Sequence, residues 1–567
     1  MTTMTGGEAV ARMLRAHGID HGFGIGGFQA LPYYDAIARL GGIRHILVRD
    51  EKHGAFAADA YARIAGRPAV ADATLGPGTT NLISGAAESY GAGVPLVMLT
   101  GEVNQAISGR GATQESDQFA MLRPTCKLAQ RVDRIDRIPE LVRKAMNACT
   151  SGRPGPVLLD IPEDVFHAEH DFPDRDLWID PMAGRLGARR ILPDPVLTAE
   201  AARLIRQARH PLVLAGGGIH LSMAYEPLAR LVEAAGIPVA TTISGKGAIA
   251  ESHSLAIGVF GRYSRIANDL IRTADLLIVI GCKLGEIATG RWTLIPENVP
   301  IVHVDIDPLE IGKIHRPTVG IWSDAGSFLD GLAAELQDSS SAMMDRSAEQ
   351  AKEVAIAKRR YERDVAGIAA ADERPIHLAR VLTELQAVAT DDMVLVAEGG
   401  FATHWSALWF DTRRAGRTYI ANRGHAAIGY GIAGALGAKL AAPNSPVVSL
   451  CGDGGFGMGI GELETLVRER TPVVLLVVNN MTLGYVKALQ NGLYDGRFQS
   501  VDFLDVDYAA IARAFGCRGE RIADPARIGP AVAQAMNENA VTVLDVLVTR
   551  DPGRMLPGID SRAVKAT

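Results

Sequence analysis

Short apolar runs alternate with longer amphipathic stretches along most of the chain. A first series of runs occupies residues 21–23, 46–48, 69–73, 96–100 and 157–161. A second series occupies residues 211–215, 238–242, 276–280 and 301–305, and a third includes residues 447–451 and 473–478. Strands that alternate with helices in this way form parallel, doubly wound sheets. The pattern therefore predicts an α/β fold of three doubly wound parallel-sheet domains.

Stretches rich in charge and proline interrupt this pattern and mark the expected domain boundaries. The expected parts are a first domain at 1–165, a linker at 166–195, a central Rossmann-like domain at 196–335, a connecting segment at 336–374, a third domain at 375–552 and a C-terminal tail at 553–567. Residues 1–18 predict an amphipathic helix rather than a signal peptide. The charge of residues 337–374 favours a long connecting helix.

Length and composition agree with a chain of several domains. With 567 residues, 47% of them hydrophobic, the chain is too large for one core. Its 58 basic and 64 acidic residues are well mixed and give a net charge of −6, so no polybasic face for nucleic acid is expected. No apolar run approaches the length of a membrane span. Because no signal peptide and no membrane span are expected, the protein is expected to be cytoplasmic. Its five cysteines show no Cys-x-x-Cys spacing and are expected to be reduced core residues.

The most specific chemical signal is Gly452-Asp453-Gly454, which follows one apolar run, with Asn479-Asn480 at the end of the next. Neighbouring parallel strands would bring this carboxylate and this amide together at one sheet edge. Mg²⁺ prefers oxygen ligands and keeps phosphate and water oxygens among them, so one Asp, one Asn and a backbone carbonyl suffice. Flanking glycines let a phosphate approach the backbone closely. Asp453, Asn480 and Thr482 are the predicted metal ligands.

A Gly-Asp-Gly triplet alone is commonly an ordinary turn. The two apolar runs and the closing Asn pair favour a ligand site instead. Together the two motifs resemble the thiamine diphosphate signature of the acetolactate synthase and pyruvate decarboxylase superfamily.

Glu51 is a second, independent candidate. It precedes a stretch rich in small residues, 54–62, which predicts a closely packed helix. A Glu at such a strand-to-helix junction is commonly a capping carboxylate. In the superfamily, the Glu that opens this helix hydrogen-bonds N1′ of the cofactor's aminopyrimidine, a role that suits a carboxyl group whose pKa is raised in an apolar pocket. The resemblance therefore assigns Glu51 to cofactor activation.

The resemblance to the acetolactate synthase branch covers nearly the whole chain, with its most specific segments at residues 74–81, 151–162 and 303–308. It implies an aminopyrimidine-binding domain at 1–165 and a diphosphate- and metal-binding domain at 375–552. The implied catalytic residues are Glu51, Gln114, His404, His425 and Gln29. The implied cofactor-binding residues are Glu51, Pro77, Asn81, Gly400, Phe401, Ala402, Thr403, His404, Ala426, Ile428, Gly452, Asp453, Gly454, Gly455, Asn480, Thr482, Leu483, Gly484, Tyr485 and Val486.

Several of these assignments have an ordinary structural alternative. Gln114 matches a family Gln that reaches the reacting centre, but a Gln in any surface loop would look the same. Most of the 14 histidines must be structural or exposed. Ile428 matches the large apolar residue that props the cofactor in its bent form, and an Ile there could equally belong to the core. Residues 26–29 fill the loop where benzaldehyde lyase has a His, whereas residues 460–463 resemble a segment of that lyase.

The chain departs from acetolactate synthases around the substrate pocket. Residues 283–287 stand where those enzymes carry Arg-Phe-Asp-Asp-Arg, and Leu489 and Thr113 replace a Trp and a Phe. Neither Lys283 nor Ile287 reproduces the bidentate grip of an Arg on a carboxylate. We therefore expect poor condensation of two pyruvates and better use of neutral or bulkier partners.

The sequence predicts a thiamine-diphosphate-dependent carboligase or lyase acting on 2-oxo acids, 2-hydroxy ketones or aldehydes through a C2 carbanion and an enamine. Acetolactate synthase proper, a flavin-linked 2-oxo acid oxidase of the same fold and a non-catalytic member of the superfamily remain alternatives. Thiamine diphosphate and Mg²⁺ are the expected cofactors. Residues 216–218, three glycines, leave FAD or ADP open, although such turns are commonly structural. The resemblance also implies a homodimer or homotetramer with active sites at subunit interfaces.

Overall fold

The computed structural model describes residues 2–337 and 341–558. The chain forms two compact units. The first contains Met1–Arg189, Asn422–Asn444 and Gly457–Val473. The second contains Arg190–Ala421, Ser445–Phe456 and Val474–Thr567. The third expected domain thus contributes to both units, and the expected domain boundaries remain a proposal. No helix in the described ranges has the length and apolar character that crossing a bilayer requires.

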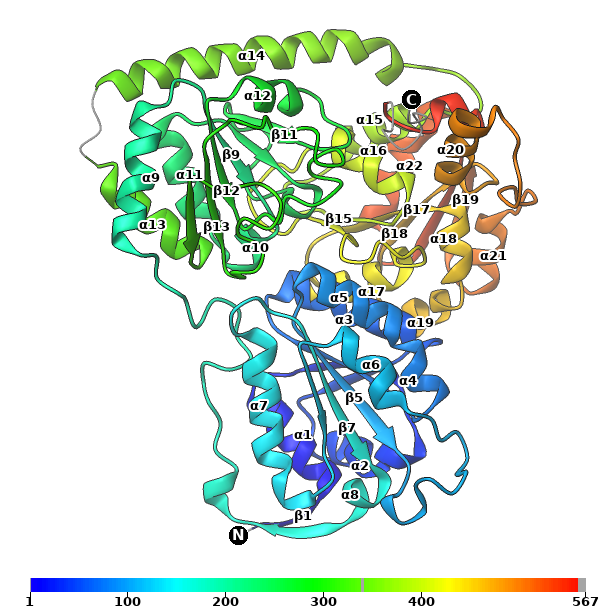
Figure 1. The fold of residues 1–567 in the computed structure, drawn as a ribbon. Coiled ribbons are helices and arrows are strands. Elements are labelled where there is room, and N and C mark those ends of the chain that lie inside the picture. The colour runs from blue at the N-terminus through cyan, green and yellow to red at the C-terminus, as the bar shows by residue number, and fades with distance from the viewer. Residues whose placement is uncertain (1, 338–340, 559–567) are drawn as a thin grey trace. The chain divides into compact units, whose positions relative to one another are not determined.

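The core of the first unit is a six-stranded parallel sheet in the order β3-β2-β4-β5-β7-β6, in blue and cyan in Figure 1. Its strands are β2 (His21–Ile25), β3 (Arg44–Leu47), β4 (Ala69–Ala73), β5 (Leu96–Glu102), β6 (Leu128–Arg131) and β7 (Pro156–Pro162). Every residue of β4, β5 and β7 is buried, as expected for strands covered on both faces. The five strands expected from the sequence are confirmed, and β6 is an additional edge strand.

Two short strands pair outside this sheet. β1 (Thr2–Thr5) runs antiparallel to β8 (Glu169–Phe172), which lies within the expected linker. The helix expected at residues 1–18 is therefore wrong for residues 2–5. Thr5 accepts a hydrogen bond from the backbone N–H of Glu8 through its side chain, and this cap makes α1 (Gly6–Ala16) begin only after the strand.

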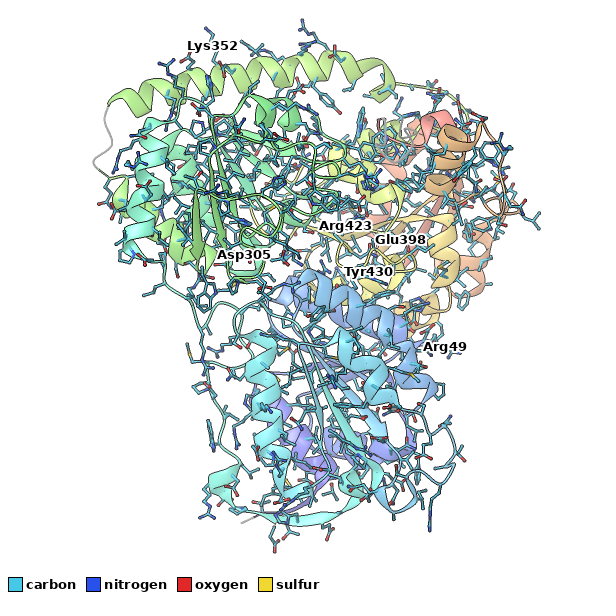
Figure 2. The ribbon with its side chains drawn as sticks, in the orientation of Figure 1. Arg49, Asp305, Lys352, Glu398, Arg423 and Tyr430 are labelled. Carbon is cyan, nitrogen blue, oxygen red and sulfur yellow. The ribbon has the colours of Figure 1, made fainter. Side chains whose placement is uncertain are left out.

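Helices cover the first unit's sheet. They are α1, α2 (Leu31–Leu40), α3 (Glu51–Ala65), α4 (Pro77–Asn81), α5 (Ile83–Ala92), α6 (Gln118–Leu122), α7 (Ile138–Thr150), α8 (Glu163–His167), α17 (Gly431–Ala441) and α19 (Glu462–Arg468). α3 and α17 pack with unusually close backbones, because a Cβ added at Gly437 would lie 1.9 Å from the carbonyl oxygen of Ala57. Beside this contact, the Tyr430 hydroxyl, labelled in Figure 2, donates to the buried Asp59 carboxylate.

The second unit contains two six-stranded parallel sheets, so the predicted α/β fold of three parallel sheets is confirmed. The central sheet has the order β11-β10-β9-β12-β13-β14 and consists of β9 (Pro211–Ala215), β10 (Val239–Thr241), β11 (Ala256–Val259), β12 (Leu276–Ile280), β13 (Ile301–Asp305) and β14 (Val319–Trp322). The C-terminal sheet has the order β16-β15-β17-β18-β20-β19 and consists of β15 (Val394–Ala397), β16 (Tyr419–Ala421), β17 (Val447–Gly452), β18 (Val474–Asn479), β19 (Arg518–Ile522) and β20 (Thr542–Leu547).

The expected connecting helix is α14 (Ser341–Ala369), drawn in green along the second unit in Figure 1. The Arg346 guanidinium donates to the carbonyl oxygens of Ile205, Ala208 and Ala235, which fixes α14 to the central sheet's helices. The other helices involved in this unit are α9 (Pro195–Gln207), α10 (Gly218–Leu221), α11 (Tyr225–Ala235), α12 (Ala267–Thr273), α13 (Ala325–Glu335), α15 (Leu378–Val388), α16 (Phe401–Trp409), α18 (Asp453–Met458), α20 (Gly484–Tyr494), α21 (Tyr508–Ala514) and α22 (Pro525–Asn537).

The α3–α17 contact makes a testable prediction about stability. Gly437→Ala places a methyl group against the Ala57 carbonyl, so the helices must separate, and we expect a loss of about 1–3 kcal/mol. Gly367→Ala is the matched control, because Gly367 lies in α14 with open space around it, and there we expect a gain of about 0.5–1 kcal/mol. Urea denaturation followed by circular dichroism measures both. Equal effects of the two substitutions would contradict the packing argument.

Candidate active site

Glu51 is the first residue of α3 in the first unit, and its side chain is 6% exposed. The capping role belongs to its neighbour, because the Asp50 side chain accepts a hydrogen bond from the backbone N–H of Lys52. Glu51 instead accepts a hydrogen bond at Oε2 from Asn81 Nδ2, at 3.0 Å. Its carboxyl group is therefore held inward, next to the short helix α4, and the alternative of a simple cap is disfavoured.

Glycines allow the loop before α4 to approach Glu51. A Cβ added at Gly78 would lie 2.9 Å from Glu51 Oε1, so a larger residue there would displace the carboxyl group. Gly76 has φ +64°, and a Cβ on it would lie 2.3 Å from the carbonyl oxygen of Gln114. Pro77 lies exposed at the first position of α4 between the two glycines.

Gln118, which sequence reasoning missed, holds this loop in place. Its side chain is buried, its Oε1 accepts from the backbone N–H of Gly76 at 2.8 Å, and its Nε2 donates to Asp160 Oδ1 at 2.7 Å. The predicted Gln114 has an exposed side chain and φ +62°, and it reaches Gly76 through its backbone. The only sequence signal for Gln118 was its place just after Asp117, the residue that caps α6.

Asp160 lies on β7 among polar neighbours from β5. The Thr100 hydroxyl donates to Asp160 Oδ1 at 2.6 Å, and Glu102 stands two residues further along β5. Burial, with the nearby Glu102 carboxylate, raises the pKa of Asp160 to about 7. Asp160 therefore holds a proton up to near-neutral pH and links Gln118 to the sheet.

The other predicted residues of the first unit lie on nearby or anchored loops. Gln29 is buried, and its Oε1 accepts from the Thr74 hydroxyl at 2.9 Å. His425 has an exposed side chain, but its backbone N–H donates to Glu88 Oε2 at 2.6 Å, as does that of Ala426 at 3.0 Å. Glu88 is fully buried and paired with Arg63 at 2.9 Å, so this carboxylate fixes the loop that leads to the half-buried Ile428. No local pattern marked Glu88 in the sequence.

The second unit brings the metal candidates together. β17 and β18 are neighbouring parallel strands with Gly452 opposite Val478, so Asp453 and Asn480 follow the ends of adjacent strands, as predicted. Asp453, Asn480 and Thr482 are each at most 2% exposed.

The side chains at this point have buried polar atoms that lack a partner among the described residues. Asp453 Oδ1 accepts from the backbone N–H of Gly454 at 2.8 Å, whereas Asp453 Oδ2 and both polar atoms of the Asn480 side chain accept or donate no hydrogen bond. Unpaired buried polar atoms are costly, and a bound cation with its water and phosphate ligands would satisfy them. The donor set therefore fits a divalent cation.

Electrostatics at Asp453 support this fit. Burial raises the pKa of Asp453 to about 6, while the backbone N–H groups of Gly454, Met481 and Thr482 oppose the rise. A cation beside the carboxylate would favour its ionised form. The described residues contain no group of three His, Cys, Asp or Glu side chains suited to a metal. A site here therefore relies on one carboxylate and an amide, which is the sparse protein contribution that Mg²⁺ accepts.

The predicted diphosphate-binding residues surround this point at three helix starts. Gly452 to Gly455 open α18, Leu483 to Val486 open α20, and Gly400 to His404, including Ala402 and Thr403, open α16. Phe401 connects two of these starts, because a Cβ added at Gly484 would lie 3.4 Å from Phe401 Cε1. Helix starts present backbone N–H groups that favour an anion.

Glu398 was not predicted and explains one glycine of the signature. It is 1% exposed and is labelled in Figure 2. Its Oε2 accepts from the backbone N–H of Gly452 at 3.1 Å, and a Cβ added at Gly455 would lie 2.3 Å from its carboxyl carbon. Gly455 is therefore required by close packing on Glu398.

His404 lies between two tyrosines in the second unit. Its ring stacks on Tyr485 with the centroids 5.6 Å apart and meets the edge of Tyr263 at 5.1 Å. His404 is 4% exposed. His404, a predicted proton carrier, therefore contacts Tyr485, a predicted cofactor-binding residue.

The glycine run at 216–218 has a packing role. A Cβ added at Gly216 would lie 2.0 Å from the carbonyl oxygen of Gly281, and one added at Gly218 would lie 2.6 Å from the Cα of Gly281. The ends of β9 and β12 thus approach through bare backbone, which explains these glycines without a bound nucleotide.

Comparison with known proteins identifies three successive matches along the chain. Residues 4–121 match the N-terminal TPP binding domain of thiamine pyrophosphate enzymes, residues 198–332 match their central domain, and residues 398–546 match their C-terminal TPP binding domain. A probable acetolactate synthase large subunit of Methanocaldococcus jannaschii is 35% identical, with 98% of this chain and 93% of that protein covered. An acetolactate synthase large subunit of Corynebacterium glutamicum is 34% identical, with 97% of this chain and 87% of that protein covered. A chloroplastic acetolactate synthase of Nicotiana tabacum is 32% identical, with 98% of this chain and 84% of that protein covered.

The raised pKa of Asp160 predicts a pH effect on stability. A carboxyl group with a raised pKa contributes stability that is present at low pH and is lost as the pH rises through about 7. The loss builds up above the ordinary carboxyl pKa of about 4 and is complete near pH 7. We therefore expect Asp160→Asn to flatten the fall in unfolding temperature between about pH 5 and pH 7, because Asn does not titrate. Thermal unfolding at several pH values measures this slope. Glu140→Gln is the control, because Glu140 is exposed, and it should leave the dependence of the unfolding temperature on pH unchanged. If Asp160→Asn also left this dependence unchanged, the raised pKa of Asp160 would be refuted.

Proposed function

The chain belongs to the thiamine pyrophosphate enzyme family, and on that premise we propose that it is an acetolactate synthase-like carboligase that cleaves a 2-oxo acid or a 2-hydroxy ketone and joins the retained fragment to a carbonyl acceptor. The observation that carries the proposal is the convergence of Asp453 and Asn480, buried at adjacent strand ends with unpaired polar atoms. A scaffold that had lost its activity would have no reason to keep these costly groups.

Asp453, Asn480 and Thr482 would hold the metal, which we propose to be Mg²⁺, and the helix starts at Gly400, Gly452 and Gly484 would hold the diphosphate. Thiamine diphosphate, when bound, supplies the electron sink that lets a bond next to a carbonyl carbon break. The protein's contribution is to fix this group and to exclude water from it. The burial of all three proposed metal ligands supports that division of roles.

In the first unit, Glu51 would hold a proton at N1′ of the aminopyrimidine, and Asn81 would keep the Glu51 carboxyl group in position. Gln118 and Gly76 keep the loop around Glu51 in place, so they are positioning residues. His404, Gln29, Gln114 and His425 are the proposed carriers of protons to and from the substrate.

Two further features remain proposals based on the sequence. One is a homodimer or homotetramer in which the half-site with Glu51 and the half-site with Asp453 come from two copies of the chain. The other is a cytoplasmic location.

Acetolactate synthase proper is the alternative favoured by the names of the relatives, and it differs only in taking pyruvate as both donor and acceptor. A flavin-linked oxidase is less well supported, since Gly216 and Gly218 already have a packing role. The absorbance spectrum of the purified protein tests both alternatives, because a yellow flavin band would favour the oxidase or the synthase, and a colourless protein would favour the proposed carboligase or lyase.

The direct test of the function is a substrate screen. We expect the protein with thiamine diphosphate and Mg²⁺ to consume at least one 2-oxo acid or 2-hydroxy ketone, with CO₂, aldehyde and the joined product measured separately. Omission of thiamine diphosphate should abolish the reaction. A protein that binds the cofactor fully and transforms none of these substrates would contradict the proposal.

Asp453→Ala should remove the one anionic ligand from the metal site. We expect Mg²⁺ and thiamine diphosphate to bind at least about tenfold more weakly, which corresponds to about 1.4 kcal/mol, while the fold is retained. Calorimetric titration of both ligands measures the loss, and circular dichroism checks the fold. The exposed Asp391, replaced by Ala in the same unit, is the control. If Asp453→Ala retained the cofactor at low Mg²⁺ as well as the wild type does, the proposed metal site would be refuted.

Glu51→Gln should separate cofactor binding from cofactor activation. Gln can still form a hydrogen bond but cannot share a titrating proton, so we expect near-normal affinity and a rate of hydrogen–deuterium exchange at the cofactor C2 about 10²–10⁴-fold slower. NMR of the quenched reaction follows this exchange. A variant that exchanges as fast as the wild type would exclude the proposed role.

A further inference from the structure

The first asparagine of the Asn479-Asn480 pair has no part in the proposed metal site, although it belongs to the motif. Asn479 is the last residue of β18 and is 1% exposed. A buried amide needs partners for its N–H groups and for its oxygen. Its Nδ2 donates to Asp545 Oδ1 at 2.9 Å and to the carbonyl oxygen of Val506 at 3.2 Å. The amide nitrogen of Asn479 is therefore bound within the protein.

The Asn479 oxygen holds the turn that carries Asn480. Met481 has φ +54°, a left-handed conformation that is rare for a residue other than glycine. The backbone N–H of Met481 donates to Asn479 Oδ1 at 3.2 Å. Asparagine side chains commonly fix a turn through such a bond to the residue two positions ahead. Asn480 lies between these two residues, so the bond fixes the backbone from which the Asn480 side chain extends.

Asp545 is the partner that the network shares. It lies on β20, fully buried, opposite Val477 of the neighbouring strand β18. Because alternate residues of a strand share a face, Asn479, two residues after Val477, extends on the same face as Asp545. The second oxygen, Asp545 Oδ2, accepts from the backbone N–H of Tyr508, the first residue of α21, at 3.2 Å. Arg521 Nε lies 3.7 Å from the same oxygen and keeps a positive charge near the buried carboxylate.

Tyr508 connects Asp545 to the other proposed metal ligand. The Tyr508 hydroxyl donates to the backbone carbonyl oxygen of Asp453, the first residue of α18, at 3.3 Å. Asp545 thus holds the turn with Asn480 through Asn479, and it reaches the start of α18 through Tyr508. One buried carboxylate is therefore linked to both segments that carry the proposed ligands.

We propose that Asp545, acting through Asn479 and Tyr508, positions the two side-chain ligands Asp453 and Asn480 before the metal ion binds. The inference rests on the proposed function and concerns the same metal site. Asp545 is a positioning residue, because other residues stand between it and the ligands. Mg²⁺ demands near-ideal octahedral geometry, so two ligands on separate segments bind it tightly only when their spacing is already close to that geometry. Groups that hold metal ligands in place commonly contribute about 10–100-fold to metal affinity.

Mn²⁺ tests this proposal without turnover, because it suits the same oxygen ligands as Mg²⁺ and is detected by electron paramagnetic resonance. The full-length protein is titrated with Mn²⁺ in the presence of excess thiamine diphosphate. We expect Asp545→Asn and Asn479→Asp each to weaken Mn²⁺ binding about 10–100-fold. Each substitution sets like groups against each other, N–H donors in the first and two carboxylates in the second.

The double variant that carries both Asn479→Asp and Asp545→Asn separates positioning from a general loss of stability. The exchange restores one amide-to-carboxylate hydrogen bond between the two positions, and the carboxylate at position 479 still accepts from the backbone N–H of Met481. We expect the double variant to bind Mn²⁺ at least about threefold more tightly than either single variant. Losses that add in the double variant would overturn the proposal.

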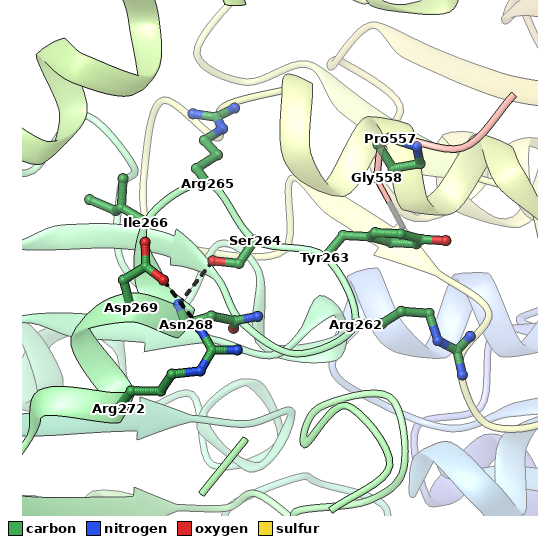
Figure 3. A pocket seen from close by; sticks show the side chains of 10 residues that line it. All are labelled: Arg262, Tyr263, Ser264, Arg265, Ile266, Asn268, Asp269, Arg272, Pro557 and Gly558. Atoms are coloured by element: carbon green, nitrogen blue, oxygen red, sulfur yellow. Dashed lines mark hydrogen bonds and ion pairs between the residues drawn. The ribbon is translucent and has the colours of Figure 1, made fainter. Parts of the chain in front are cut away.

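Two controls in the same unit carry the same chemical changes away from the metal site. Asp305 is a buried carboxylate at the end of β13 that accepts a backbone hydrogen bond at 2.9 Å. Asn268 lines a cavity of about 250 Å³ whose other lining residues lie at 262–272 and 557–558, outside the network (Figure 3). Its amide accepts from and donates to the backbone of Gly261. We expect Asp305→Asn and Asn268→Asp to keep the Mn²⁺ affinity within about twofold of the wild type.

The Mn²⁺ titration distinguishes failure of this inference from failure of the proposed function. Wild-type affinity in Asp545→Asn would overturn the inference and leave the metal site intact. A wild type that binds Mn²⁺ no better than Asp453→Ala does would overturn both. Mn²⁺ binding that depends on Asp545, without turnover of any 2-oxo acid or 2-hydroxy ketone, would uphold the inference and refute the proposed function.

Tyr508→Phe decides if the single variants do not fold, because it removes only the hydroxyl that donates to the Asp453 carbonyl oxygen. The loss of one hydrogen bond should weaken Mn²⁺ binding about 2–10-fold. Unchanged Mn²⁺ affinity in Tyr508→Phe would then overturn the inference.

Discussion

Burial of polar groups near the carboxyl ends of parallel strands is the constraint on which the candidate residues of each unit depend. Such groups lose their hydration and must each gain a partner. In the first unit other side chains provide these partners. Asn81 donates a hydrogen bond to Glu51, and Gln118 donates one to Asp160. In the second unit Asp453 and Asn480 keep unpaired atoms. The polar groups around Glu51 are therefore paired within the protein, whereas those of Asp453 and Asn480 would gain partners from a ligand.

Glycine makes this burial possible, because the elements around each half-site meet backbone to side chain. Gly78 leaves room for the Glu51 carboxyl group, and Gly455 leaves room for that of Glu398. In both places an added β-carbon would lie within 2.9 Å of an atom of the carboxyl group. The signature glycines thus act mainly by admitting a buried acid, and only secondarily through the flexibility of their backbone.

Sequence reasoning predicted what is encoded locally. Five strands of the first sheet, four of the central sheet and two of the C-terminal sheet follow from apolar runs. The convergence of Asp453 with Asn480 follows from the rule that parallel strands end at one edge. It missed Glu88 and Gln118, whose importance comes from backbone partners far along the chain: Glu88 accepts from residues 424–426. It also extended a helix over residues 2–5, because the pairing of β1 with β8 joins segments more than 160 residues apart. Such partners leave no periodic trace in the sequence.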